Sequence, residues 1–218
     1  HVQIVVKDNL HGGYQAAVTI TNNESINTYD STLDYVGKGG LNIIKNLKGH
    51  AMEDGQFQFT VKPVDQASAD KAGIKLDGVT FDSSAAQMTD GVATNVIQVF
   101  KELKFNQKDA GTTYKYTITE SKGGDESKGY TNDDTVYTVS MNVKDNNAGV
   151  LTVTTTVSDG LESKDYVYTN EADQPKETAQ AVFENVYNAE GTLGGDGEGT
   201  AKINATKELV NGVMEGKE

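Results

Sequence analysis

Hydrophobic and polar residues alternate along most of this 218-residue chain. Because every second side chain of a β-strand points to the same face, such alternation predicts strands with one buried face. The clearest stretches are residues 2–6, 15–20, 56–61, 96–100, 114–119, 135–143 and 150–157. Turn-forming clusters of Gly, Asn and Asp separate them, and residues 66–73 alone have a weakly helical pattern. The chain is therefore expected to be all-β, with antiparallel strands packed as a sandwich or Greek key.

Two internal similarities suggest a tandem array. INATKELVNGVME (203–215) resembles LNIIKNLKGHAME (41–53), and VKDN occurs at both 6–9 and 143–146. The composition of GTLGGDGEGT (191–200) is that of a flexible, acidic linker. The expected organisation is end strands of a preceding unit at 1–40, a complete unit at 41–190, a linker at 191–200 and the first strand of a following unit at 201–218.

The composition narrows the choice of partners. A formal net charge of -13 gives a field that repels nucleic acid and anionic membranes, so neither is expected as a partner. No stretch approaches the length of apolar sequence that a membrane-spanning helix needs. The chain contains no cysteine, so a covalent staple would need chemistry other than a disulfide.

Three polar residues interrupt the apolar strand patterns. Lys45 lies in LNIIKNLKG, Glu120 ends YKYTITE, and Asn185 is centred in AVFENVYN. An unpaired charge inside a strand of this kind costs several kcal/mol. Each residue alone has an ordinary explanation, because a lysine can extend to water, a glutamate can lie in a polar turn and an asparagine can satisfy a backbone group. Three such interruptions in one domain suggest that the side chains meet.

Their meeting would allow an amide bond to form. Burial lowers the pKa of a lysine and raises that of a glutamate, so both can be neutral. A neutral amine is a nucleophile. A protonated carboxyl group can donate a hydrogen bond to the asparagine carbonyl and transfer protons as ammonia leaves. Close confinement supplies a high effective concentration, so a single slow turnover without a cofactor is enough.

Four segments resemble the FctA-type isopeptide-linkage domain of Gram-positive pilins, which is related to the B-type repeats of collagen adhesins. They are KNLKGHAMEDGQFQF (45–59), VFKELKFNQKDAGTTYKYTITE (99–120), VKDNNAGVLTV (143–153) and AVFENVYN (181–188). The resemblance covers about residues 41–188 and implies an Ig-like, B-type β-sandwich. It also implies a cross-link between Lys45 and Asn185 that Glu120 assists. Asn170 in YVYTN is a rival acceptor, because a long segment (157–180) precedes the final strand.

The resemblance implies a structural role. The chain is expected to be a shaft or stalk unit of an extracellular, cell wall-associated fibre or adhesin, whose cross-link resists pulling. It is not expected to be an enzyme beyond one autocatalytic turnover, and its partners would be neighbouring copies or domains of the fibre. The alternative is an adhesin module that binds a host glycan or protein through loops 65–95 and 157–180, where Tyr166 and Tyr168 are candidate contacts. These two tyrosines alternate as in a strand, however, which favours packing in the core or at a sheet edge.

The remaining signals are weaker. His1, His11 and His50 lack metal-ligand spacing, and no calcium-loop spacing occurs, so no metal site is expected. Asp133 and Asp134 have the pattern of solvated turn residues. The unpaired end segments suggest that the strand carrying Lys207 docks against residues 1–36 of the next subunit, where Asn22 or Asn23 would be the acceptor if a bond formed.

Overall fold

The computed structural model describes residues 2–21, 31–171 and 177–188. The expected acceptors Asn22 and Asn23, the linker at 191–200 and the segment that carries Lys207 lie outside the described residues. The strands are β1 (Val2–Asp8), β2 (Tyr14–Ile20), β3 (Thr32–Asp34), β4 (Leu41–Lys48), β5 (Gln58–Pro63), β6 (Val79–Asp82), β7 (Met88–Thr89), β8 (Val92–Val99), β9 (Lys104–Asn106), β10 (Thr113–Lys122), β11 (Tyr130–Thr131), β12 (Val136–Asp145), β13 (Leu151–Ser158), β14 (Ser163–Thr169) and β15 (Ala179–Tyr187). The helical segments are α1 (Gln66–Ala72), η1 (Gln107–Asp109) and η2 (Glu126–Lys128).

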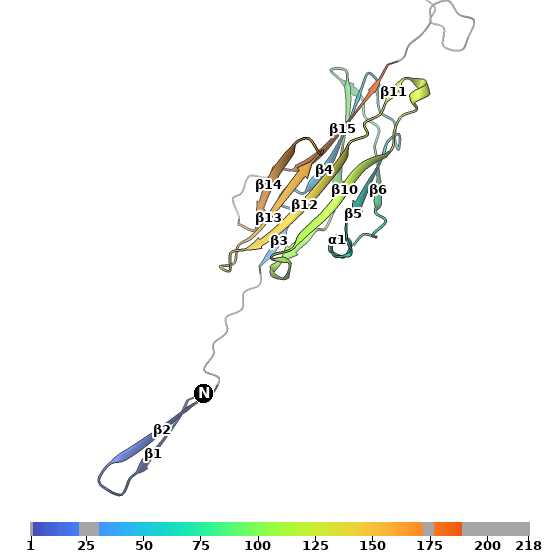
Figure 1. Cartoon of the computed structure of the whole chain (residues 1–218). Helices are drawn as coiled ribbons and strands as arrows, with labels where there is room; N and C mark the ends of the chain where they lie inside the picture. Colours follow the sequence, from blue (N-terminus) through green and yellow to red (C-terminus); the bar gives the residue numbers. More distant parts are fainter. Residues whose placement is uncertain (1, 22–30, 172–176, 189–218) are drawn as a thin grey trace, which may run out of the picture.

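Two sheets pack face to face and form the expected β-sandwich (Figure 1). One sheet has the strand order β14-β13-β12-β10-β5-β6, and the other has the order β11-β15-β4-β8-β7. Their pairings are antiparallel with one exception, because β15 runs parallel to β4. The first and last strands of these two sheets are therefore neighbours that run in the same direction, which the expectation of an antiparallel fold did not include.

The alternation seen in the sequence places one set of side chains in the core. In β4, the inward positions hold Leu41, Ile43, Lys45 and Leu47, all buried, whereas the residues between them are only half buried. Strand β13 alternates in the same way. The seven expected strands are confirmed, and the helical segment expected at residues 66–73 is α1, which ends at Ala72. Asp65 caps the start of α1, and Gly73 ends it in the left-handed conformation.

Residues 31–40 belong to the sandwich. Strand β3 pairs with β9, and Leu33 and Tyr35 are fully buried in the core. The hydroxyl of Tyr35 lies 3.0 Å from that of Thr155 on β13. The expected boundary at residue 40 is therefore placed too late, because residues 31–40 share the core of the unit that follows them.

The long segment before the last strand supplies an edge strand. Strand β14 pairs with β13, and both of its tyrosines, Tyr166 and Tyr168, are buried. The hydroxyl of Tyr168 donates to the carbonyl oxygen of Gly40 at 3.0 Å and accepts from the backbone N–H of Ala179 at 2.9 Å. It thereby joins the starts of β4 and β15. Burial makes these two rings unavailable as surface contacts for a ligand.

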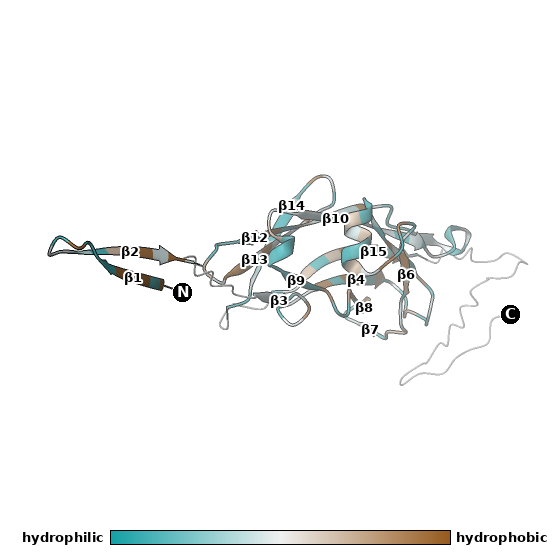
Figure 2. Ribbon diagram, turned by 90° about the horizontal axis from the view of Figure 1, so that it is seen from below, coloured by the Kyte–Doolittle hydropathy of each residue, from teal (hydrophilic) through white to brown (hydrophobic). Residues whose placement is uncertain are grey.

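Strands β1 and β2 form a hairpin whose two faces differ. Val2, Ile4 and Val6 share one face with Ile20, Val18 and Ala16, their partners across the hairpin, and all residues of both strands are exposed. Figure 2 shows the apolar colouring of both strands. The register matches that of β12 and β13, where Val139, Met141 and Val143 pair with Val157, Thr155 and Val153 and are buried in the core. The hairpin thus has the pattern of a strand pair whose apolar face lacks a covering sheet among the described residues.

Candidate cross-linking site

Lys45, Glu120 and Asn185 converge between the two sheets. Lys45 and Asn185 lie on neighbouring strands, since β4 residue Lys45 is the register partner of Phe183 and Asn185 is that of Leu47. Glu120 lies on β10 of the facing sheet, at the end of an inward row formed by Tyr114, Tyr116 and Ile118. The side chains of Lys45 and Glu120 are 0% and 1% exposed, and Asn185 is also 0% exposed.

Glu120 bridges the other two residues. The Lys45 Nζ atom donates to Glu120 Oε2, and the Asn185 Nδ2 atom donates to Glu120 Oε1 at 2.6 Å. Next to Glu120, the register of β10 against β5 shifts at a bulge between Glu120 and Lys122. Bulges re-aim side chains at functional sites. The amine, the carboxyl group and the carboxamide that were expected to meet are therefore brought together.

Burial perturbs the acid–base properties of the pair. Desolvation lowers the pKa of Lys45, although the hydrogen bond and charge of Glu120 oppose this effect. Desolvation likewise raises the pKa of Glu120, and Lys45 opposes the shift. Both directions favour the neutral amine beside the neutral carboxylic acid. The rings of Phe57 and Phe59, whose centroids lie 4.4 and 6.0 Å from Lys45 Nζ, form an apolar wall around the amine.

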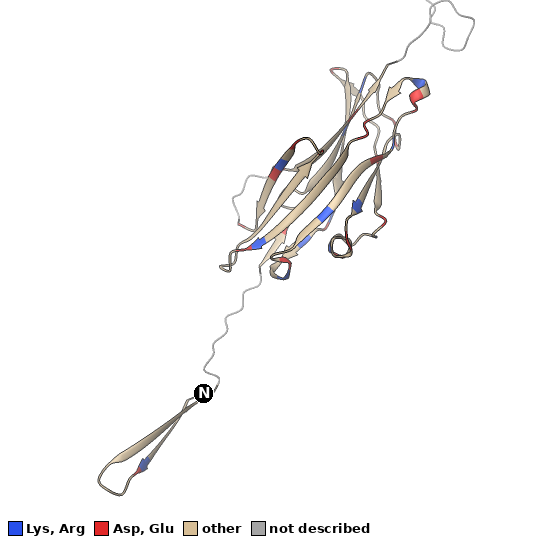
Figure 3. Ribbon diagram, in the orientation of Figure 1, with Lys and Arg blue, Asp and Glu red and all other residues tan. Residues whose placement is uncertain are grey.

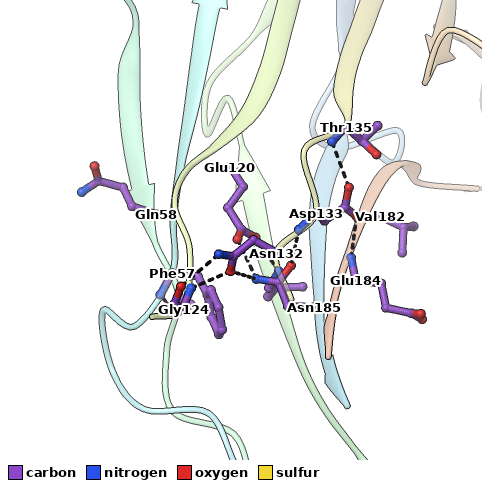
Figure 4. A network of polar contacts seen from close by, with 12 residues as sticks. Phe57, Gln58, Glu120, Gly124, Asn132, Asp133, Thr135, Val182, Glu184 and Asn185 are labelled. Atoms are coloured by element: carbon purple, nitrogen blue, oxygen red, sulfur yellow. Dashed lines mark hydrogen bonds and ion pairs between the residues drawn. The ribbon is translucent and has the colours of Figure 1, made fainter. Parts of the chain in front are cut away.

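The loop at residues 132–133 also contacts the site, which the sequence analysis did not predict (Figure 4). The backbone N–H of Asp133 donates to Asn185 Oδ1 at 2.9 Å, and Asn185 Nδ2 donates to Asn132 Oδ1 at 3.1 Å. The expectation that Asp133 is a solvated turn residue is wrong, because it is half buried and its carboxylate accepts from the backbone of Thr135 and Glu184. Asp134 is exposed, as expected.

The contact of Glu120 with Asn185 differs from the expected one. Sequence reasoning placed the carboxyl group against the asparagine carbonyl, but the structure places it against the amide nitrogen. The carbonyl oxygen is instead held by the N–H of Asp133. A turn sequence such as TNDD does not reveal such a contact, because the partner, Asn185, lies on a distant strand.

The rival acceptor Asn170 lies elsewhere. Its side chain accepts from the backbone N–H of Leu151 at 3.0 Å and donates to the carbonyl oxygen of Gly149 at 2.9 Å. These bonds hold the turn between β12 and β13. Asn185, and not Asn170, is the asparagine that contacts Glu120.

A second lysine–carboxylate pair provides a contrast. Lys71 Nζ lies 2.6 Å from Asp109 Oδ2, and Asp109 also accepts from the Tyr114 hydroxyl at 2.6 Å and the Asn106 backbone N–H at 2.7 Å. Burial alone would raise the pKa of Asp109, but the hydrogen bonds from Lys71, Tyr114 and Asn106 outweigh it and hold the pKa below its ordinary value. The surroundings of Asp109 thus favour its ionised form, whereas those of Glu120 favour the neutral acid.

Other kinds of site find no support in the described part of the chain. It contains no group of three or more His, Cys, Asp or Glu side chains that could hold a metal ion. None of its helices is long and apolar enough to cross a membrane. In the view of Figure 3, acidic and basic residues are dispersed over strands and loops.

Comparison with known proteins identifies one family. Residues 41–188 match the family model described as FctA, Spy0128-like isopeptide containing domain. Among solved structures, the chain is similar to the major pilin protein T-13 of Streptococcus pyogenes, with 18% identity and a TM-score of 0.37 over 76% of this chain and 59% of that pilin. The chain thus spans less than two thirds of the pilin it matches, and the family match carries the assignment. A search of curated proteins found no match.

Proposed function

The chain belongs to the FctA family of Spy0128-like isopeptide-containing domains, and we propose that it is a shaft subunit of a cell-surface fibre stabilised by an internal Lys45–Asn185 isopeptide bond. The observation that carries the proposal is the buried contact of Glu120 with both Lys45 and Asn185. The three side chains supply a nucleophile, a proton-transfer group and an electrophile, and all three are closed off from solvent.

The proposed reaction starts from a neutral Lys45 amine and a neutral Glu120 carboxylic acid. The lone pair of Lys45 Nζ attacks Cγ of Asn185, and the carboxylic acid of Glu120 gives its proton to the departing Nδ2 atom, which its Oε1 already contacts. The Glu120 carboxylate that this leaves then accepts the proton that Nζ loses. Ammonia leaves and an amide remains. The fold holds the groups together, so the high effective concentration replaces the activation that an enzyme would supply.

Intact mass spectrometry tests this function directly. The purified chain is expected to weigh about 17 Da less than its sequence because one ammonia is lost. Lys45→Ala and Asn185→Ala should each retain the full sequence mass, whereas Asn170→Ala, a matched asparagine outside the site, should still lose ammonia. A wild-type mass equal to that of the sequence would exclude the bond.

For assembly, we propose that the exposed face of the β1–β2 hairpin receives a strand from a neighbouring copy of the chain. Support comes from two likenesses: the hairpin has the register of β12–β13, and residues 203–210 resemble β4 of the covering sheet. A head-to-tail contact of this kind does not close on itself and builds a filament at the cell surface. Lys207 would occupy the place that Lys45 has in β4, with Asn22 or Asn23 nearby.

Deleting residues 201–218 tests the assembly proposal separately from the bond. The truncated chain should remain cross-linked, since Lys45, Glu120 and Asn185 are intact, but should no longer self-associate in sedimentation velocity experiments. Unchanged association of the truncated chain would refute strand donation and leave the isopeptide proposal standing.

A further inference from the structure

The carboxamide of Asn185 is held in one orientation by groups whose hydrogen-bonding roles cannot be exchanged. The backbone N–H of Asp133 can only donate, and it lies 2.9 Å from Oδ1. If the carboxamide were rotated by half a turn, its NH2 group would face this donor. The carbonyl oxygen must therefore be the atom that faces Asp133.

Asn132 fixes the other end of the carboxamide in the same way. The Gly124 N–H donates to Asn132 Oδ1 at 2.7 Å, and Asn132 Nδ2 donates to the Gly124 carbonyl oxygen at 2.9 Å. These two bonds set the orientation of Asn132 and direct its Oδ1 towards Asn185 as an acceptor. The Nδ2 atom of Asn185 therefore lies between Glu120 Oε1 and Asn132 Oδ1.

The N–H of Asp133 is itself held in place by the strand that carries Asn185. The Asp133 carboxylate accepts from the Glu184 N–H at 2.8 Å and from the Thr135 N–H at 2.9 Å. The loop at residues 132–133 is thus tied to β15 beside the reacting carboxamide (Figure 4). A donor fixed in this manner needs no reorganisation when charge develops on the oxygen it faces.

We propose that residues 132–133 complete the reaction centre: the Asp133 N–H stabilises the oxyanion that forms on Asn185 Oδ1, and Asn132 positions the leaving nitrogen. This inference rests on the proposed isopeptide function. As the Lys45 Nζ–Cγ bond forms, the carbonyl electrons move onto Oδ1, towards the Asp133 N–H. They return as the Cγ–Nδ2 bond breaks, and the proton lost by Nζ reaches Nδ2 through Glu120, so that neutral ammonia leaves and no charge remains.

The test follows bond formation over time. Cell-free synthesis is pulsed and chased, samples are quenched in denaturant, and the fraction that has lost ammonia is read by intact mass. Replacing Asp133 by its α-hydroxy analogue, which turns the N–H into an ester oxygen, is expected to slow the reaction about 100-fold to 1,000-fold. Asn132→Ala is expected to slow it about 10-fold to 100-fold, because the leaving group loses its alignment.

Two controls separate chemistry from folding. Asn46→Ala alters the asparagine next to Lys45, whose side chain lies on the other face of β4 and accepts from the Thr94 hydroxyl, and should react at the wild-type rate. Asn132→Ala in the Lys45→Ala background, where no bond can form, measures the effect of the substitution on folding alone. Asn132→Asp keeps an oxygen that can accept from both Gly124 and Asn185 but loses the bond donated to the Gly124 carbonyl oxygen, so it should recover part of the rate that Asn132→Ala loses.

Each outcome has a defined meaning. Slow loss of ammonia in both the Asp133 ester and Asn132→Ala, together with recovery in Asn132→Asp, supports the proposal. A wild-type rate in the ester or in Asn132→Ala overturns the role given to that group. If Asn132→Ala fails to fold even in the Lys45→Ala background, Asn132→Asp decides: partial loss of ammonia there supports the positioning role, and no loss of ammonia overturns it. A wild-type chain that never loses ammonia refutes the isopeptide function itself, which separates that failure from failure of this inference.

Discussion

Lys45 has only apolar neighbours in its inward row of β4, namely Leu41, Ile43 and Leu47. Desolvating a charged amine there would cost several kcal/mol, and neutralisation together with Glu120 avoids most of that cost. A neutral pair holds the same number of protons as an ionised pair. The opposite pKa shifts of Lys45 and Glu120 therefore do not by themselves make folding depend on pH in the neutral range.

Glu120→Gln is expected to abolish cross-linking. The amide cannot take a proton from Lys45 or return one to the leaving nitrogen, although it is nearly the same size as the acid. Intact mass should equal the sequence mass, and the midpoint of thermal unfolding should fall towards that of Lys45→Ala. Asp109→Asn, which alters the other buried carboxyl group, should remain cross-linked. Ammonia loss in Glu120→Gln would mean that another group transfers the proton.

The Lys71–Asp109 pair is expected to contribute stability that depends on pH. Because the folded-state pKa of Asp109 lies below its ordinary value of 3.8, this contribution is complete above about pH 3.8 and is lost as the pH falls through the depressed pKa. Thermal unfolding of wild type and of Lys71→Met/Asp109→Asn should therefore differ most near neutral pH and converge in stronger acid. A difference that grows on acidification would contradict the ionised assignment.

Among individual residues, the sequence pattern predicted the three that react but not the loop residues that contact them. Lys45, Glu120 and Asn185 could be found because each breaks an apolar alternation, which fixes the direction of its side chain. Asn132 and Asp133 lie in a polar turn, where such residues are ordinary. Their contact with Asn185 depends on how a loop folds over a strand that is distant in sequence, and no local pattern encodes that.

Among the elements, β14 has a role that the sequence pattern only partly indicated. The alternation of Tyr166 and Tyr168 predicted a strand with packed rings, and both rings are buried. The parallel pairing of β4 with β15 was not predicted. The alternation of apolar and polar residues shows which side chains of a strand face the core, but not whether the strand runs parallel or antiparallel to its neighbour. The Tyr168 hydroxyl, by bonding to Gly40 and Ala179, fixes where these two strands begin side by side.

Tyr168→Phe is expected to weaken this junction. Removal of the hydroxyl takes away its bonds to Gly40, Glu177 and Ala179, while the Ala179 N–H keeps the Gly40 carbonyl oxygen as an acceptor at 3.1 Å, so the loss should be about 0.5–1.5 kcal/mol of unfolding free energy. Urea unfolding should be measured in the Lys45→Ala background, so that the cross-link does not mask the loss. Tyr166→Phe on the same strand is the matched control and should cost less. Equal losses in the two variants would show that the hydroxyl of Tyr168 has no special role.

For the whole molecule, the proposed bond would close a ring through most of the sandwich. Lys45 and Asn185 enclose a loop of roughly 140 residues, for which the chain-entropy estimate used for disulfides gives about 5 kcal/mol. The ring begins at Lys45 within β4 and ends at Asn185 within β15. Because these strands are parallel neighbours, the chain enters the strand pair at Leu41 and leaves it at Tyr187, at opposite ends of the pair.

A ring of this kind would make the fibre tolerant of a cut backbone. Leu161, in the turn between β13 and β14, is 94% exposed and invites cleavage by a protease that prefers large apolar residues. After one cut there, the cross-linked chain should still migrate as a single species in denaturing gels and gain about 18 Da of water, whereas Lys45→Ala should separate into two fragments. A subunit nicked inside the ring would thus keep the segments before Lys45 and after Asn185 covalently connected, and a protease would have to cut outside the ring to separate neighbouring subunits of the fibre.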